Sequence, residues 1–192
     1  MMFQRMIIAA AGAFVLLVAG ASAEEQKPLT ENQAKRFVAS LESVDSMRDR
    51  LEAEGKIDNI EIATKPKPGE AFTPYSKAVT ALKDKYPADH ARLAKIVKSH
   101  GFSAKDWGDA GDRVMIAYIA LKMQDEDPRT MQMMQTMDKS MLDMVPPEMR
   151  AQLESTFAMM EAVKNVSEAD KRAVAPVKAA LDAYMDKNAE AD

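Results

Sequence analysis

An uninterrupted apolar run in the middle of the chain constrains the fold more than any other feature. From Val114 to Leu121 the sequence reads VMIAYIAL, and only the hydroxyl of Tyr118 is polar. The run lies within Phe102–Gln124, where apolar residues recur at steps of three and four, the period of a helix face. A helix that is apolar on all sides belongs in the middle of a bundle, and this run is too short to cross a membrane. The sequence therefore predicts an all-α, single-domain bundle of about six to seven helices around a central helix at about 104–124.

The first 23 residues have the pattern of a secretory signal peptide. Arg5 provides a positive charge, an apolar run follows, and positions 21–23 read Ala-Ser-Ala, which fits a small-residue cleavage site. We therefore expect residues 1–23 to be removed and residues 24–192 to form a helical domain in the periplasm. The alternative is an uncleaved anchor, because Met6–Ala23 is one uncharged run. No later stretch approaches spanning length, so no integral membrane span is expected after cleavage.

The chain has no cysteine and a formal net charge of −4. The lack of cysteine excludes disulfides, cysteine-based zinc sites, thiol catalysis and the lipid anchor of a bacterial lipoprotein. The negative balance argues against a nucleic-acid partner and against an anionic membrane surface. The fold must therefore be held together by its apolar core, which a domain of this size is large enough to bury.

Capping signals divide the rest of the chain into helices. Thr30 opens a T-x-x-Q capping box, and Gly55 and Gly101 are placed to end helices. The stretch Lys56–Ala71 contains proline and glycine without periodicity, so we expect a loop there. Pro176 is expected to kink or split the last helix. Further helix starts are expected at Pro74, Pro87, Ser103, Arg129, Pro147 and Ser167.

Methionine is the most unusual feature of the composition. The chain has 16 methionines, and nine of them lie between Met131 and Met160. The first interpretation is a core face, because flexible methionine fills irregular gaps. The second is a groove that accepts varied apolar partners, and the third is copper(I) binding, because thioethers are soft ligands. The candidate partner-binding face consists of Met131, Met134, Met137, Met141 and Met144.

The histidines and large aromatic residues fit structural roles as well as functional ones. His90 and His100 lie ten residues apart on one expected helix and match no zinc-binding spacing. A histidine on the surface and a histidine that caps a helix C-terminus, as His100 would, are sufficient structural roles for the two. Trp107 and Tyr118 suit either a ligand pocket or the edge of the core.

Three aspartates near the start of the central helix share one side of it. Asp106, Asp109 and Asp112 would form an acidic cleft if that side faced one, and a hydrolase is the corresponding hypothesis. Acidic residues also suit a helix N-terminus for purely structural reasons. The chain has no P-loop, no G-x-S-x-G and no Rossmann glycine pattern. We therefore expect no enzymatic activity, no catalytic residue, no cofactor and no metal site.

Two resemblances to exported helical proteins bear on function. Leu29-Thr30-x-x-Gln33 resembles the LTxxQ motif of the CpxP/Spy-type periplasmic chaperones, which implies a small exported protein that is apolar on a concave face. That group carries the motif twice, whereas this chain carries it once. The chain is also similar to a group of small exported all-helical alphaproteobacterial proteins. The similarity lies in the order of its features: Arg36-Phe37, then Gly101-Phe102 and Trp107, then Met-rich helices and a Pro-kinked last helix. That similarity implies no particular activity.

These features predict an exported, non-enzymatic envelope protein that binds apolar or protein partners. Chaperone-like binding of unfolded or envelope proteins is one form of this function. The alternative is a copper(I)-binding or metal-buffering periplasmic protein that uses its Met-rich helices.

Overall fold

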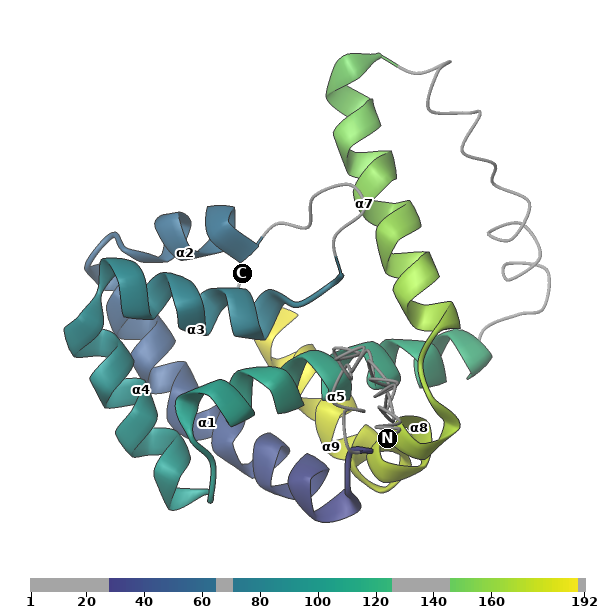
Figure 1. The fold of residues 1–192 in the computed structure, drawn as a ribbon, viewed down its shortest axis with the longest axis horizontal. Coiled ribbons are helices and arrows are strands. Elements are labelled where there is room, and N and C mark those ends of the chain that lie inside the picture. The colour runs from purple at the N-terminus through teal and green to yellow at the C-terminus, as the bar shows by residue number, and fades with distance from the viewer. Residues whose placement is uncertain (1–27, 65–70, 126–145, 190–192) are drawn as a thin grey trace, which may run out of the picture.

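The structure, a computed structural model, describes residues 28–64, 71–125 and 146–189. Within these ranges every regular element is a helix, which confirms the expected all-α, single-domain bundle (Figure 1). The elements are α1 (Glu31–Ala53), α2 (Ile57–Thr64), α3 (Pro74–Lys85), α4 (Pro87–Ser99), α5 (Ala104–Asp125), α7 (Pro147–Lys164), α8 (Glu168–Val174), the 3-10 turn η2 (Ala175–Val177) and α9 (Lys178–Ala189). None of these helices is long and apolar enough to cross a membrane.

Helix α5 is the central helix that the apolar run predicts. It packs against α1, α3, α4, α7 and α8. Val114 and Ala117 on this helix are fully buried. Trp107 is also buried, and its indole N–H donates to the Ser40 Oγ of α1 at 2.7 Å, so the polar group of a core residue is satisfied. Trp107 is therefore a core residue.

Two glycines on α5 allow α3 to lie close to it. A Cβ atom at Gly111 would stand 2.7 Å from the Cγ of Tyr75 and 2.8 Å from the Cε2 of Phe37. A Cβ at Gly108 would stand 3.1 Å from the Cα of Ser76. The rings of Phe37 and Tyr75 meet edge to face with centroids 5.4 Å apart. Glycine is thus required here by the close approach of an aromatic pair and a helix backbone.

The expected helix ends at Thr30, Gly55 and Gly101 are confirmed. Thr30 and the residue three positions later form a complete capping box at the start of α1. Gly55 and Gly101 have positive φ angles of 65° and 78°, the left-handed geometry that ends helices. After Gly101, the backbone N–H of Phe102 donates to the carbonyl of Val97 at 3.1 Å, which completes a Schellman motif.

The stretch predicted to be a loop begins with a helix instead. Residues 57–64 form α2, which packs against α1 and α3. Ile60 is 5% exposed, and the ammonium of Lys85 on α3 donates to the carbonyl of Asn59 at 3.1 Å. A helix of this length has little stability alone, so tertiary packing of Ile57 and Ile60 decides its structure.

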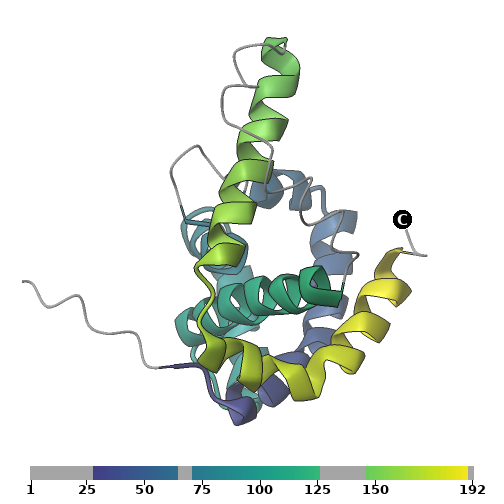
Figure 2. The ribbon, with the colours of Figure 1, turned by 90° about the vertical axis from the view of Figure 1, so that its right-hand side faces the viewer.

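The C-terminal helices follow the expected breaks. The hydroxyl of Ser167 accepts the backbone N–H of Asp170 at 3.0 Å and caps α8. Pro176 lies in η2, which separates α8 from α9, so the predicted split of the last helix is confirmed. The N-terminal part of α7 extends away from the other described helices (Figures 1 and 2).

Two buried carboxylates tie distant segments together. Asp170 accepts the backbone N–H of Leu29 at 2.9 Å and two bonds from the guanidinium of Arg113. Asp89, which is 2% exposed, binds Arg50 at 3.0 Å and Lys56 at 2.9 Å. Because a buried charge is tolerated only when it is paired, both clusters are structural.

Candidate functional site

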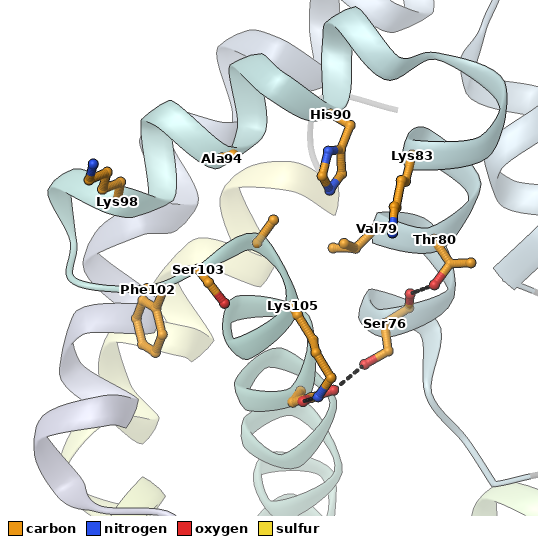
Figure 3. Close-up of a pocket in the computed structure, with 12 residues that line it drawn as sticks. Ser76, Val79, Thr80, Lys83, His90, Ala94, Lys98, Phe102, Ser103 and Lys105 are labelled. Atoms are coloured by element: carbon orange, nitrogen blue, oxygen red, sulfur yellow. Dashed lines mark hydrogen bonds and ion pairs between the residues drawn. The ribbon is translucent and has the colours of Figure 1, made fainter.

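A cleft of about 820 Å³ opens between α3, α4 and α5 (Figure 3). Its volume falls within the range of about 300–1,000 Å³ that is typical of ligand-binding pockets. Its floor is apolar and consists of Val79, Ala94, Phe102 and Ala104. Two of these four side chains are single methyl groups, which leaves room that a larger residue would fill.

Helix periodicity places the lining on two of the three helices. On α4 the lining residues His90, Ala94 and Lys98 recur at every fourth position, so they share one face. On α3 the lining residues are at positions 76, 79, 80 and 83, which again share one face of the helix. The turn at Phe102 and the first turn of α5 close the remaining side of the cleft.

Hydrogen bonds already occupy the carboxylate of the lining and the hydroxyls of Ser76 and Thr80. The hydroxyl of Ser76 donates to Oδ1 of Asp109 at 3.1 Å, and the ammonium of Lys105 contacts Oδ2 at 2.6 Å. The Thr80 hydroxyl donates back to the carbonyl of Ser76 at 2.9 Å. The negative charge of Asp109 is therefore balanced by Lys105.

Two further lysines stand on the rim of the cleft. Lys83 and Lys98 are exposed, and neither forms an ion pair with any residue that the structure describes. In Figure 3, Lys83 and His90 both point toward Val79, whereas Lys98 lies at the opposite end of α4. With Asp109 balanced, these two lysines make the cleft positive in a chain whose net charge is −4.

The three aspartates near the start of α5 do not line one cleft. Asp109 lines the cleft described above, whereas Asp106 hydrogen-bonds Ser103 at 2.7 Å in the cap of α5. Asp112 accepts the backbone N–H groups of Tyr75 at 2.7 Å and Ser76 at 3.2 Å. Burial raises the pKa of the Asp112 carboxyl above its ordinary value, while the bonds from Ser76 and Tyr75 act in the opposite direction. The three aspartates predicted to share one side of the helix thus bind three different sets of partners and do not form one acidic cleft.

The histidines lie in different places. His90 lines the cleft, whereas His100 is the C-cap residue of α4, as the sequence suggests. His100 borders a second, smaller hollow of about 550 Å³ beside Arg36 and Gly101. The guanidinium of Arg36 donates to the carbonyl of Gly101 at 3.2 Å and stacks over the ring of Phe102 at 4.8 Å. Across the described ranges, no three acidic or histidine side chains converge as a metal site.

The candidate methionine face lies outside the described residues. Its five members are Met131, Met134, Met137, Met141 and Met144, and all of them fall within 126–145. Their expected role as a partner-binding face therefore stays a prediction. Met159 and Met160, on the described helix α7, are half-buried.

Sequence reasoning did not single out Lys83, Lys98 or the floor residue Ala94. The recurrence of His90, Ala94 and Lys98 at every fourth position was a visible signal that they share a face. That spacing does not say which helices flank the face or how much room they leave. Three separate helices must meet before the cleft exists.

Comparison with protein-family models, curated proteins and solved structures finds no match for this chain. The described part of the chain defines the class of protein: a single-domain helical bundle that carries an open, cationic cleft with an apolar floor.

Proposed function

We propose that this protein is an exported, non-enzymatic envelope protein that binds apolar segments of protein partners in a chaperone-like manner. The α3–α4–α5 cleft is the binding surface. The observation that carries this proposal is the combination of an apolar floor at Val79, Ala94 and Phe102 with a cleft of about 820 Å³. Apolar pockets of this size with a few polar groups around them are the usual places for ligands.

The polar lining favours binding over catalysis. Asp109 is held by Lys105 and Ser76, which is the environment of a structural ion pair and not of a general base. The Thr80 hydroxyl is engaged with the backbone of its own helix, so it is not paired with a base as an activated nucleophile would be. What the cleft offers a ligand is apolar surface on its floor and positive charge on its rim.

Export supports the envelope setting. The charged start, the apolar run and the Ala-Ser-Ala at 21–23 are the pattern of a secretory signal peptide. In an extracytoplasmic compartment, a small protein with an open apolar cleft meets partly folded proteins in transit. Those proteins expose the apolar segments that the cleft fits.

The test is suppression of the aggregation of a reduced, unfolded client protein, measured by light scattering. Ala94→Phe fills the floor of the cleft and should abolish protection. Ala88→Phe makes the same change at an exposed position of α4 outside the lining and should leave protection intact. Thr80→Phe, at an exposed lining position, provides a second cleft-filling variant with little risk to folding.

Circular dichroism and thermal melts establish that each variant is folded. Equal protection by the wild-type protein and both cleft-filling variants would reject the cleft as the binding surface. No protection by the wild-type protein would reject the chaperone-like function itself.

A further inference from the structure

We propose that the cleft selects acidic, extended peptide segments, with Lys83 and Lys98 as the residues that determine this selectivity. The inference rests on the proposed function and names the chemistry of the partner. Its structural basis is the pairing of an apolar floor with two rim lysines that lie at opposite ends of that floor.

The sign of the charge around the cleft is the first argument. Its lining holds three lysines and one carboxylate, and that carboxylate, Asp109, is already paired with Lys105. Lys83 and Lys98 have no carboxylate partner among the residues that the structure describes. An anionic partner is therefore complementary to this surface.

The spacing of the charges is the second argument, and it decides between an acidic peptide and an amphiphile with one charged head. On α4, His90 and Lys98 are eight residues apart, or about 12 Å along the helix axis. Lys83 stands with His90 at one end, and Lys98 stands at the other (Figure 3). A ligand with a single charged head would use the positive charge at only one end. A chain with several negative charges uses both.

An extended peptide also matches the layout of floor and rim. Its residues advance by about 3.3 Å each, so about four of them cover the distance along α4. Alternate side chains point in opposite directions, so apolar residues can rest on Val79, Ala94 and Phe102 while acidic neighbours reach the lysines. A segment in which acidic and apolar residues alternate satisfies both surfaces at once.

The two parts of the cleft should contribute differently. Lys83 and Lys98 are exposed, and exposed ion pairs are weak and screened by salt. The apolar floor therefore provides most of the affinity, and the lysines provide selectivity and faster association. Discrimination between acidic and neutral peptides should accordingly fade as the salt concentration rises.

Fluorescence anisotropy can measure the affinity of the protein for a labelled peptide of about six residues in which glutamate and leucine alternate. The same peptide with glutamine in place of glutamate is the neutral probe. The purified protein should bind the acidic peptide about tenfold or more tightly than the neutral one at low salt. The double variant Lys83→Glu/Lys98→Glu should lose that preference.

The matched control is Lys95→Glu/Lys187→Glu. It makes the same change in net charge at two exposed lysines outside the cleft lining, neither of which has an ion-pair partner among the described residues. This control should bind the acidic peptide nearly as the wild-type protein does. An equal loss in both double variants would show that net charge, and not the cleft, governs binding, and would overturn the proposal.

The remaining outcomes separate this inference from the proposed function. Binding of both peptides with equal affinity, together with client protection that Ala94→Phe abolishes, would overturn the acidic selectivity and leave the cleft as a binding surface. Binding of dodecanoate in the cleft with no binding of either peptide would replace the peptide with an anionic amphiphile. No binding of peptide and no protection of an unfolded client would overturn both.

Discussion

The carboxylate of Asp112 on α5 accepts the backbone N–H of Tyr75 on α3 at a distance of 2.7 Å. Tyr75 is the second residue of α3, and Asp112 also accepts the next N–H along the helix, from Ser76, at 3.2 Å. Thr73, the residue at the N-cap position, makes no side-chain cap. One helix therefore supplies the cap of another, and this cap fixes the position of the cleft wall that α3 forms.

Replacing Asp112 with alanine should destabilise the protein because two backbone N–H groups at the start of α3 lose their acceptor. Loss of a helix cap costs about 0.5–2 kcal/mol. For a domain of this size, 1 kcal/mol corresponds to about 2–4 °C in the melting temperature. Differential scanning calorimetry provides the measurement. Asp49→Ala, at an exposed position of α1, is the control and should melt close to the wild-type temperature.

Gly111→Ala should also be destabilising, against the usual preference of helices for alanine. Alanine normally favours a helix interior by about 1 kcal/mol relative to glycine. Here the added methyl group would stand 2.7 Å from the ring of Tyr75 and 2.8 Å from the ring of Phe37. Overpacking of this kind costs about 1–3 kcal/mol. Urea denaturation should show a lower midpoint, and a midpoint above that of the wild-type protein would show that α3 does not approach α5 this closely.

Tyr118→Phe should change how the protein responds to acid. The Tyr118 hydroxyl donates to Asp182 on α9 at 2.7 Å, and this bond together with Lys178 lowers the pKa of the Asp182 carboxyl to about 2. The unfolded value is about 3.9, so this ionised carboxylate stabilises the folded state above about pH 4. That contribution is lost as the pH falls through about 2.

In the phenylalanine variant, the pKa of Asp182 should rise toward its ordinary value. Protonation of Asp182 then accounts for a smaller part of the stability that the protein loses in acid than it does in the wild-type protein. An NMR titration of the Asp182 carboxyl carbon measures the shift in pKa directly. Tyr184→Phe removes a bond to a different carboxylate, Asp45, and should leave the titration of Asp182 unchanged.

Local chemistry explains which parts of the fold were predictable from sequence. The caps at Thr30 and Ser167 and the glycine at position 101 act within a few residues, so their roles are visible in the sequence itself. Pro176 lacks a backbone N–H and therefore interrupts any helix that contains it. The central helix was also predictable, because the apolar run Val114–Leu121 is long enough that it must be buried.

The parts that sequence reasoning missed depend on contacts between distant segments. Helix α2 follows a glycine and precedes a proline-rich stretch, and burial of Ile60 in the core decides its structure. Asp109 and Asp112 lie three residues apart on one helix, yet each is used by a different part of α3. The cleft needs Ala94 and Lys98 of α4 to face α3 and α5, and no spacing within α4 specifies that arrangement.

Export makes a prediction that is independent of the cleft. If the Ala-Ser-Ala at 21–23 is the cleavage site, intact mass spectrometry of the periplasmic protein should identify Glu24 as the first residue. Ala23→Arg should slow or block processing, because signal peptidase sites require a small residue there. Full-length protein held in the inner membrane of wild-type cells would instead establish Met6–Ala23 as an anchor.

The methionine face separates the proposed function from its copper(I) alternative. Met134, Met137 and Met141 recur at helical spacing in the stretch 131–144, which lies outside the described residues. Changing all three to leucine roughly conserves volume and apolar character, and such changes usually cost less than about 1.5 kcal/mol each in a core. Protection of an unfolded client should therefore largely survive the triple change, whether these residues form core or an adaptable partner-binding face.

Copper(I) binding should not survive the same change, because leucine offers no lone pair to the metal. A competition assay with a chromogenic copper(I) chelator measures affinity in the wild-type and triple-leucine proteins alongside client protection. Tight copper(I) binding that the leucines abolish, with no client protection in either protein, would establish the metal-buffering function in place of the proposed one. Client protection in both proteins, lost when Ala94→Phe fills the cleft, would place partner binding at α3–α4–α5 and would show that this binding does not need the methionine sulfurs.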